Sequence, residues 1–229
     1  MVQYENAWQA VEARIARACE AAGRPRNTVR LLAVSKTFPP AAVRAVHGLG
    51  QRAFGENYVQ EAVAKMDALS GLKGLEWHLI GPLQSNKAGP AAGRFDWVHT
   101  IDRARIAERL SAARPPSLPP QNVCVQVNIS GEATKSGVAP DEALALAEDV
   151  ARLPRLALRG LMGIAAPLPA MATRRAQYRV LRLLLEGCRE TGLDVDTLSM
   201  GMSDDLEAAI AEGATIVRIG TAIFGPRDA

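Results

Sequence analysis

Strand-like and helix-like segments alternate along almost the whole of this sequence. The first apolar run, Val29 to Ser35, is followed by a helical pattern led by prolines at residues 39–50, and this order then repeats. Regular alternation favours a parallel sheet, and eight such units in about 200 residues favour closure of the sheet into a (β/α)8 barrel. The predicted strands are residues 29–35, 52–57, 75–81, 95–101, 123–130, 156–162, 197–201 and 215–220.

A further helix precedes the alternating series. Apolar residues recur at steps of three and four from Trp8 to Ala22, which predicts an amphipathic helix, and Gly23 and Pro25 end it. The predicted fold class is therefore α/β: a single (β/α)8 TIM barrel with an additional N-terminal helix, in which residues 1–229 form one domain. A doubly wound open sheet is the alternative, but no G-x-G-x-x-G motif follows the first strand to favour it.

A proline-rich segment, RPPSLPP at residues 114–120, looks like a linker between domains. Because the strand pattern resumes after it, with apolar residues alternating from Val123 to Ile129, we interpret the segment as a stiff loop between a helix and a strand. The chain is 48% hydrophobic and 22% charged over 229 residues, a composition that suits one soluble barrel with a large core.

The charges and the start of the chain argue against several classes of partner. The 27 basic and 24 acidic residues leave a net charge of +3, and the basic residues are scattered, with Arg174 and Arg175 as the densest pair, so we expect no nucleic-acid partner. The acidic start does not resemble a secretory signal, and no stretch reaches the roughly 18 apolar residues that span a bilayer. We therefore expect a cytoplasmic protein that does not bind membranes.

The cysteines and histidines show no metal-binding pattern. The cysteines lie far apart without a C-x-x-C motif, and the histidines have neither H-x-H nor H-E-x-x-H spacing. We expect reduced thiols and no metal site. These residues are Cys19, Cys124, Cys188, His47, His78 and His99.

Lys36 ends the apolar run LLAVSKT at residues 31–37. The functional face of a (β/α)8 barrel lies at the carboxyl ends of its strands, and Lys36 directly follows the first predicted strand. Taken alone, such a lysine is most simply a strand end that reaches water. In a water-poor pocket, however, its amine would lose basicity and could attack an aldehyde.

Two more groups lie at the same face, residues 200–203 after the seventh strand and residues 218–225 at the end of the eighth. Barrels often bind phosphate with these two loops. Ser203, Gly220 and Thr221 offer hydroxyl donors and backbone N–H groups that an anion can approach closely. Each could instead be only a helix cap or a turn residue, but their positions at neighbouring strand ends favour phosphate binding.

Arg218 lies within the apolar strand TIVRIG. Alternation places Ile216, Arg218 and Gly220 on one face of this strand. A guanidinium among apolar residues needs an acceptor, because burying it unpaired is costly. The acceptor could be a structural partner across the barrel, such as Glu56, or an atom of a ligand.

Together, an amine, a phosphate site and an arginine donor match the aldehyde, the phosphate and the ring nitrogen of pyridoxal 5′-phosphate (PLP). A lysine that condenses with an aldehyde explains why Lys36 stands at the functional face. The alternative is a phosphate-binding barrel without PLP, in which Lys36 is only a cation.

Several segments resemble the pyridoxal phosphate homeostasis proteins, a family of PLP-binding proteins. They span most of the chain in the family's order, with small departures such as Leu79 that preserve residue character. The last segment is long enough to be highly specific. The matching segments are AVSKT (33–37), FGENYVQE (54–61), WHLIGPLQSNK (77–87), NISGEATKSG (128–137), GLMGI (160–164) and LSMGMSDDLEAAIAEGATIVRIGTAIFG (198–225).

The resemblance implies a single barrel similar to the N-terminal domain of bacterial alanine racemases. It also implies a Schiff base between PLP and Lys36, with Arg218 facing the pyridine nitrogen. Asn57, in FGENY, would lie near the ring, although it could equally be a turn residue at a strand end.

The resemblance further implies that Ser203, Gly220 and Thr221 hold the phosphate. Proteins of this family are thought to carry, buffer or deliver PLP, the vitamin B6 cofactor, with apo-PLP enzymes as candidate recipients. No robust catalytic activity is established for the family.

Arginine as the ring partner weakens PLP as an electron sink, because Arg218 cannot give a proton to the ring nitrogen, but weak activation still suits racemisation, so Arg218 alone does not exclude an enzyme. The sequence ends at Ala229, four residues after Gly225, so we expect no second domain like the one that completes the site and the dimer of alanine racemases. Tyr58 is the one candidate base near a strand end. We therefore predict a monomeric PLP carrier and not an enzyme; the alternative is a racemase-like enzyme of low activity.

Overall fold

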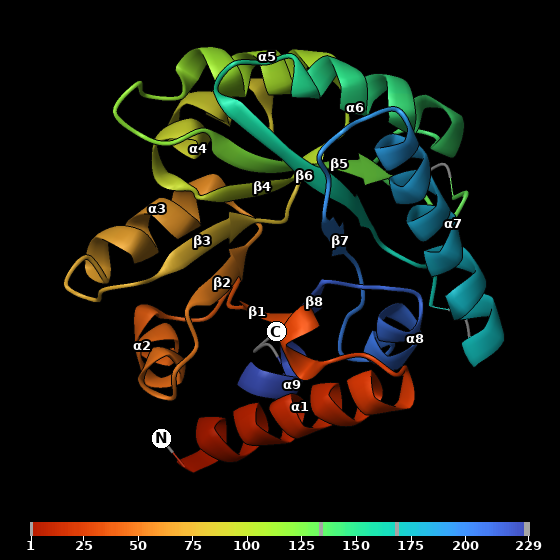
Figure 1. Ribbon diagram of the computed structural model, residues 1–229. Coiled ribbons are helices and arrows are strands. Elements are labelled where there is room, and N and C mark those ends of the chain that lie inside the picture. The colour runs from red at the N-terminus through yellow and green to blue at the C-terminus, as the bar shows by residue number, and fades with distance from the viewer. Residues whose placement is uncertain (1, 133–134, 168–169, 227–229) are drawn as a thin grey trace.

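The computed structural model describes residues 2–132, 135–167 and 170–226. Within these ranges eight parallel strands pair in sequence order, and the first also pairs with the last, so the sheet closes (Figure 1). The predicted (β/α)8 barrel is confirmed, and the open-sheet alternative is wrong. The strands are β1 (Arg30–Val34), β2 (Ala53–Glu56), β3 (Glu76–Leu79), β4 (Trp97–Ile101), β5 (Gln121–Val127), β6 (Leu156–Gly163), β7 (Thr197–Ser199) and β8 (Ile216–Ile219).

Helices surround the barrel. They are α1 (Val2–Ala21), α2 (Pro40–Gly48), α3 (Val59–Ala68), α4 (Ala88–Arg94), α5 (Ala104–Ala113), α6 (Ala143–Ala151), α7 (Met171–Glu190), α8 (Leu206–Ala211) and α9 (Thr221–Phe224), with short 3-10 helices η1 (Arg26–Thr28), η2 (Ser85–Lys87) and η3 (Pro140–Glu142). The proline-rich residues 114–120 form the loop between α5 and β5, as interpreted from the sequence. The four-residue helix α9 was not predicted, because its sequence is too short to show a helical period.

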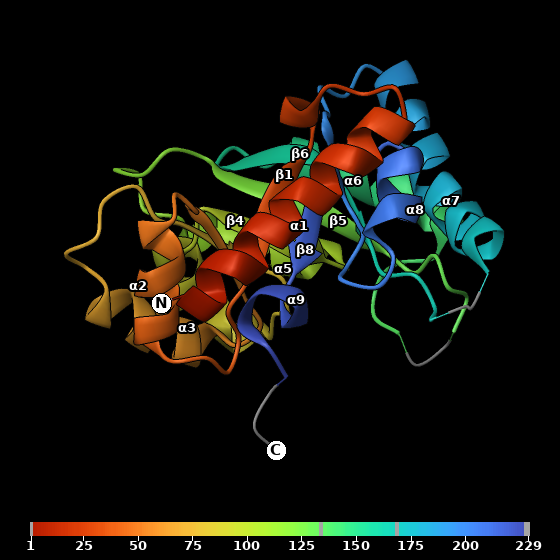
Figure 2. The same cartoon turned by 90° about the horizontal axis from the view of Figure 1, so that it is seen from below.

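The additional N-terminal helix α1 lies across α8 and α9 (Figures 1 and 2). Val11 and Ile15 on its apolar face are buried in the core, as the sequence spacing predicts. Near its start, the ring of Tyr4 meets the ring of Phe224 edge-on, with 5.9 Å between the ring centroids. Because α9 has only four residues, α1 supplies the length of helix that is missing at this position of the outer ring.

Strand side chains alternate between the barrel interior and the layer beneath the helices. On β8, Ile216 belongs to the interior, whereas Val217 and Ile219 join the larger core outside the sheet. This alternation confirms the predicted face of Arg218. The interior apolar cluster consists of Leu32, Ala53, Trp97, Cys124, Met162 and Ile216.

The pairing of β5 with β6 shifts by one residue after Val123, which pairs with Leu158. The shift lies at Gly160, whose φ of 151° strains any L residue, and a Cβ there would lie 2.0 Å from the carbonyl oxygen of Thr197. Only glycine fits at this close approach. The bulge shifts the register of β6 on β5 before β6 ends at Gly163, beside the site described next.

Candidate functional site

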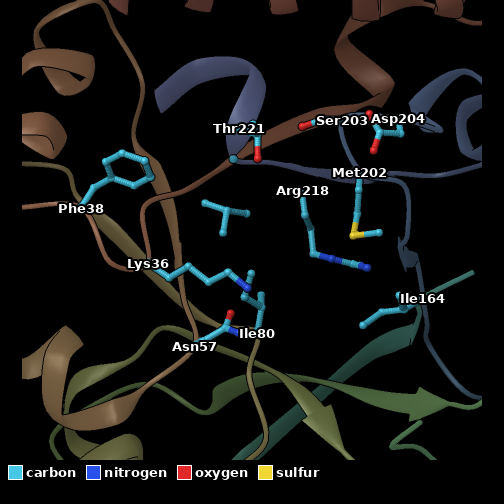
Figure 3. Close-up of a pocket in the computed structure, with 12 residues that line it drawn as sticks. Lys36, Phe38, Asn57, Ile80, Ile164, Met202, Ser203, Asp204, Arg218 and Thr221 are labelled. Carbon is cyan, nitrogen blue, oxygen red and sulfur yellow. The ribbon is translucent and has the colours of Figure 1, made fainter. Parts of the chain in front are cut away.

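A cavity of about 230 Å³ opens at the carboxyl ends of the strands, the face at which barrels carry their functional sites. Figure 3 shows Lys36 and Arg218 reaching toward the middle of this cavity, with Ser203 and Thr221 on its upper edge. All six residues predicted from the sequence line it. The lining residues are Val34, Lys36, Phe38, Asn57, Ile80, Ile164, Met202, Ser203, Asp204, Arg218, Gly220 and Thr221.

Lys36 is aimed by the turn that ends β1. The next residue, Thr37, has a φ of 69°, a left-handed conformation that β-branched residues rarely adopt. The N–H of Thr37 donates to a carboxylate oxygen of Glu61 at 2.6 Å, which stabilises this strained turn. The turn directs the partly exposed Lys36 side chain into the cavity.

A buried ion pair supports the end of β1 from behind. The Nζ of Lys65 lies 2.6 Å from Oε1 of Glu56 and donates to the carbonyl oxygen of Ser35 at 2.8 Å. The two side chains are only 3% and 0% exposed. Burial raises the pKa of Glu56, although the charge of Lys65 opposes the rise. The interpretation in which Glu56 pairs with Arg218 is therefore wrong, because Glu56 faces α3 and bonds to Lys65.

The guanidinium of Arg218 is buried among neutral acceptors. Its Nη1 donates to the carbonyl and the hydroxyl oxygens of Ser199 at 2.5 and 2.9 Å, and its Nη2 donates to the carbonyl oxygen of Gly163 at 3.0 Å. Burial lowers the pKa of Arg218. These three bonds occupy at most three of the five N–H groups of an arginine, so the others can serve an acceptor in the cavity.

The loop after β7 brings Ser203 to the edge of the cavity. Its carbonyl oxygen accepts a hydrogen bond from Arg14 of α1, and the carbonyl oxygen of Asp204 accepts one from Arg174 of α7, each at 2.5 Å. Both carbonyl groups thus point toward the outer helices. The N–H groups of Met202 and Asp205 bond within the loop, to Oδ1 of Asp205 and to the carbonyl oxygen of Met202. An anion in the cavity could therefore be bound at this loop by the Ser203 hydroxyl and the N–H groups of Ser203 and Asp204.

Gly220 and Thr221 continue this edge at the end of β8. A Cβ at Gly220 would lie 3.3 Å from the carbonyl oxygen of Val34, so glycine allows the two strand ends to approach closely. Thr221 is the first residue of α9, where backbone N–H groups have no acceptor within the helix. The sequence predicted that Ser203, Gly220 and Thr221 lie at the neighbouring ends of the seventh and eighth strands, and their positions confirm this.

Asn57 and Tyr58 follow β2 but lie differently. Asn57 is partly buried and lines the cavity, and its backbone touches Gly81, where a Cβ would lie 2.2 Å from the carbonyl oxygen of Asn57. Tyr58 is 59% exposed and is not part of the cavity lining. The candidate base from the sequence is therefore outside this site.

The apolar walls of the cavity were not predicted. Val34, Ile80 and Ile164 lie at or just beyond the ends of β1, β3 and β6. Strand alternation counted back from each strand end could have identified them, because they share the inward face with polar lining residues. Phe38 and Asp204 lie in loops, where the sequence carries no periodic signal, whereas Met202 belongs to residues 200–203, which the sequence placed at this face.

The described ranges, residues 2–132, 135–167 and 170–226, also bear on metal, thiol and membrane chemistry. They contain no group of three or more His, Cys, Asp or Glu residues arranged to hold a metal ion. Cys19, Cys124 and Cys188 are buried and not in disulfides. None of the described helices has the length and apolar character needed to cross a membrane.

Comparison with known proteins places the chain in a family. Residues 7–228 match the family described as "Alanine racemase, N-terminal domain". The chain is 60% identical over 218 residues to the pyridoxal phosphate homeostasis protein of Pseudomonas aeruginosa, covering 95% of this chain and 93% of that protein. It is 53% identical over 220 residues to the Escherichia coli K12 protein of the same name, covering 95% and 94%.

A solved structure shares the architecture. The structure of PipY from Synechococcus elongatus with PLP bound superimposes with a TM-score of 0.81 at 38% identity, covering 92% of this chain and all of that one. The barrel, the order of its motifs and these identities over nearly the full length agree with one another. This chain belongs to the pyridoxal phosphate homeostasis protein family, whose barrel is that of the alanine racemase N-terminal domain.

Proposed function

We propose that this chain binds PLP in the cavity at the carboxyl end of the barrel and serves PLP homeostasis by carrying, buffering and delivering the cofactor. One observation carries the proposal: an amine, a guanidinium and two hydroxyls, from Lys36, Arg218, Ser203 and Thr221, converge on one cavity. The names of the relatives and the PLP bound to PipY support the same ligand.

The donor set fits PLP group by group. Lys36 would hold the aldehyde carbon as a Schiff base, and the donor-only guanidinium of Arg218 suits the ring nitrogen. Ser203 and Thr221 suit the phosphate, and apolar walls such as Ile80 suit the faces of the ring. When bound, PLP supplies an aldehyde that condenses with amines and a ring that accepts electrons.

A carrier fits these residues better than an enzyme does. Arg218 donates hydrogen bonds but does not release a proton, so it would leave the ring nitrogen neutral and the electron sink weak, which still suits racemisation. Tyr58, the candidate acid/base, is exposed outside the cavity. A racemase-like enzyme of low activity is the second candidate. Turnover of amino acids near the usual median of about 10 per second would overturn the carrier proposal.

Borohydride reduction followed by mass spectrometry tests the proposal directly. The protein is incubated with PLP, reduced and digested, and the expected result is a pyridoxyl group on the peptide that contains Lys36. A pyridoxyl group spread over several exposed lysines, with no enrichment at Lys36, would contradict it.

The Arg218→Met variant should bind PLP more weakly by about 10- to 150-fold, because a hydrogen bond from a charged donor contributes roughly 1.5–3 kcal/mol. Arg218→Lys keeps the charge without the planar fork, so its affinity for PLP should lie between those of the wild-type protein and Arg218→Met. Absorbance titration measures the affinities and the visible spectrum. An unchanged affinity and spectrum in both variants would mean that Arg218 only supports the fold.

Ser203→Ala and Thr221→Ala should discriminate between two forms of the ligand. Each should weaken the binding of PLP by about tenfold or more, because a hydrogen bond to a charged phosphate is lost. Binding of pyridoxal, which has no phosphate, should change by less than about twofold. Equal losses for both ligands would argue against a phosphate site at this edge.

The proposal also covers the location of the protein, its oligomeric state and the delivery of PLP. We propose a cytoplasmic monomer that passes PLP to apo-PLP enzymes. Sedimentation at several concentrations tests the monomer, and activation of a purified apo-PLP enzyme by the loaded protein tests delivery. Activation no faster than with the same concentration of released PLP would count against delivery.

A further inference from the structure

A continuous line of hydrogen bonds crosses the barrel interior from Arg218 to the opposite end. Ser199 Oγ lies 2.9 Å from Nη1 of Arg218 and 2.8 Å from Nδ1 of His99. Nε2 of His99 lies 2.8 Å from Nδ1 of His78, whose Nε2 lies 2.8 Å from Oε1 of Glu76. Ser199 and both histidines are fully buried. The proposed binding of PLP uses none of these four residues directly.

The carboxylate of Glu76, at the far end of this line of hydrogen bonds, determines which group donates and which accepts in each bond. Burial would raise the pKa of Glu76, but its hydrogen bonds to His78 and Arg30 and the charge of Arg30 outweigh it and lower that pKa to about 2. Arg30 donates to both carboxylate oxygens at 2.7 Å. An ionised carboxylate only accepts hydrogen bonds, so Nε2 of His78 must carry a proton and donate it.

Burial also influences where the ring protons of His78 and His99 lie. It lowers the pKa of His78, and burial together with the charge of Arg218 lowers the pKa of His99 well below its ordinary value. These shifts favour the neutral form of each ring near neutral pH. A neutral His78 that donates from Nε2 to Glu76 must accept at Nδ1, so a neutral His99 donates from Nε2 and accepts at Nδ1. The hydroxyl of Ser199 must then donate to His99, which leaves its oxygen lone pair for Arg218.

Trp97 holds the two imidazole rings in place. It stacks on His78 with 5.4 Å between the ring centroids and 7° between the planes, and it packs beside His99 at 5.7 Å. Rings that cannot rotate keep their nitrogen atoms in the line. The direction of every donor is thus fixed from Glu76 to Ser199.

We propose that Glu76, His78, His99 and Ser199 are positioning residues that hold the guanidinium of Arg218 in the orientation that presents its remaining N–H groups to the ring nitrogen of PLP. The inference rests on the proposed function. Each neutral link donates toward the carboxylate, so each polarises the next, and the Ser199 oxygen becomes a stronger acceptor for Arg218. A Ser199 hydroxyl without this partner would be free to rotate and would hold Arg218 less firmly.

The proton positions are tested first in the protein without ligand. The chain has three histidines, so two-dimensional NMR of their ring nitrogens is simple to assign, with the partly exposed His47 as an internal reference. The expected result near neutral pH is a neutral ring protonated at Nε2 for both His78 and His99. A proton on Nδ1 of either ring would overturn the proposal.

The consequence for Arg218 is tested with a matched set of variants. Ser199→Ala should raise the dissociation constant for PLP about three- to tenfold and shift the wavelength or pH midpoint of the visible band, and Ser199→Thr should restore both. Thr197→Val is the control: it removes another hydrogen-bonded hydroxyl of β7, which bonds to Asp196 and not to the line. It should change the dissociation constant by less than about twofold.

The outcomes separate this inference from the proposed function. If the wild-type protein binds no PLP, the proposed function fails, while the NMR result still decides the direction of the line. If PLP binds but Ser199→Ala behaves like Thr197→Val, the positioning role is wrong. If Ser199→Ala does not fold, Glu76→Gln replaces it, since this side chain is 29% exposed. Unchanged Nε2–H resonances of His78 and His99 in that variant would equally refute the proposal.

Discussion

Lys36→Ala is expected to abolish the covalent attachment of PLP completely. The amine of Lys36 is the group that would condense with the aldehyde. The substitution shortens the side chain to a methyl group, which cannot replace the amine. The visible band of the protein–PLP complex should disappear, and borohydride should trap no pyridoxyl group on the peptide of residues 31–37. Absorbance and mass spectrometry measure the two effects.

The fold of this variant should remain intact. Lys36 is partly exposed at a strand end, and surface substitutions usually change the free energy of unfolding by no more than about 0.5 kcal/mol. Lys73→Ala is the matched control, because Lys73 is exposed and lies outside the cavity; it should keep the band. A band that survives in Lys36→Ala would refute the assignment of the amine.

Lys65→Met should lower the free energy of unfolding by about 3–5 kcal/mol. The substitution removes the cation from a buried pair and leaves Glu56, which is fully buried, without its partner. Because Lys65 also bonds to the carbonyl oxygen of Ser35, the end of β1 and the turn at Lys36 and Thr37 should loosen as well. Urea denaturation measures the loss.

The loss should depend on pH with a definite sign. Burial already raises the pKa of Glu56 in the folded state, and removing Lys65 raises it further. A raised folded-state pKa contributes stability at low pH that is lost as pH rises through it, so the deficit of Lys65→Met should be larger at about pH 8 than at about pH 5.

Two variants complete this test. The double variant Lys65→Met/Glu56→Gln removes the unpaired charge and should recover much of the stability. Lys73→Met is the control for removal of an exposed lysine and should cost no more than about 0.5 kcal/mol. A Lys65→Met loss as small as that of Lys73→Met would show that the buried pair contributes little.

The barrel and the edge of the cavity could be predicted because both depend on local patterns. Period-two alternation placed Arg218 on the inward face of β8, and strand ends placed Lys36 and Ser203 at the carboxyl face. The role of each residue toward PLP remains a prediction. The distances between residues of different strands could not be predicted, because they depend on barrel closure and register.

Lys65 shows what local patterns miss. Glu61 and Lys65 stand four residues apart, a spacing typical of an exposed ion pair on a helix surface. In the structure they do form that pair at 3.2 Å, but Lys65 is 3% exposed and bonds more closely to Glu56. Burial of the lysine follows from how α3 packs on the barrel, which no spacing within the helix reveals.

The line from Glu76 to Arg218 was missed for a related reason. Its members come from β3, β4, β7 and β8, and in the sequence His78 and His99 were considered only for metal-binding spacing, which they lack. Histidines on the inward face of two strands could have suggested an interior polar line. Which atoms meet, however, depends on the register between strands, and the bulge at Gly160 shows that register is not uniform around the barrel.

The place of α1 has a consequence for protein synthesis. Its apolar face packs mainly on α8 and α9, with smaller contacts to η1 and α2, so α1 leaves the ribosome long before most of its docking surface does. Roughly 180 residues separate the end of α1 from the start of α8. At the usual pace of translation, α1 therefore waits about 10 to 40 s for α8, and the outer ring of helices cannot close before α8 and α9 have emerged.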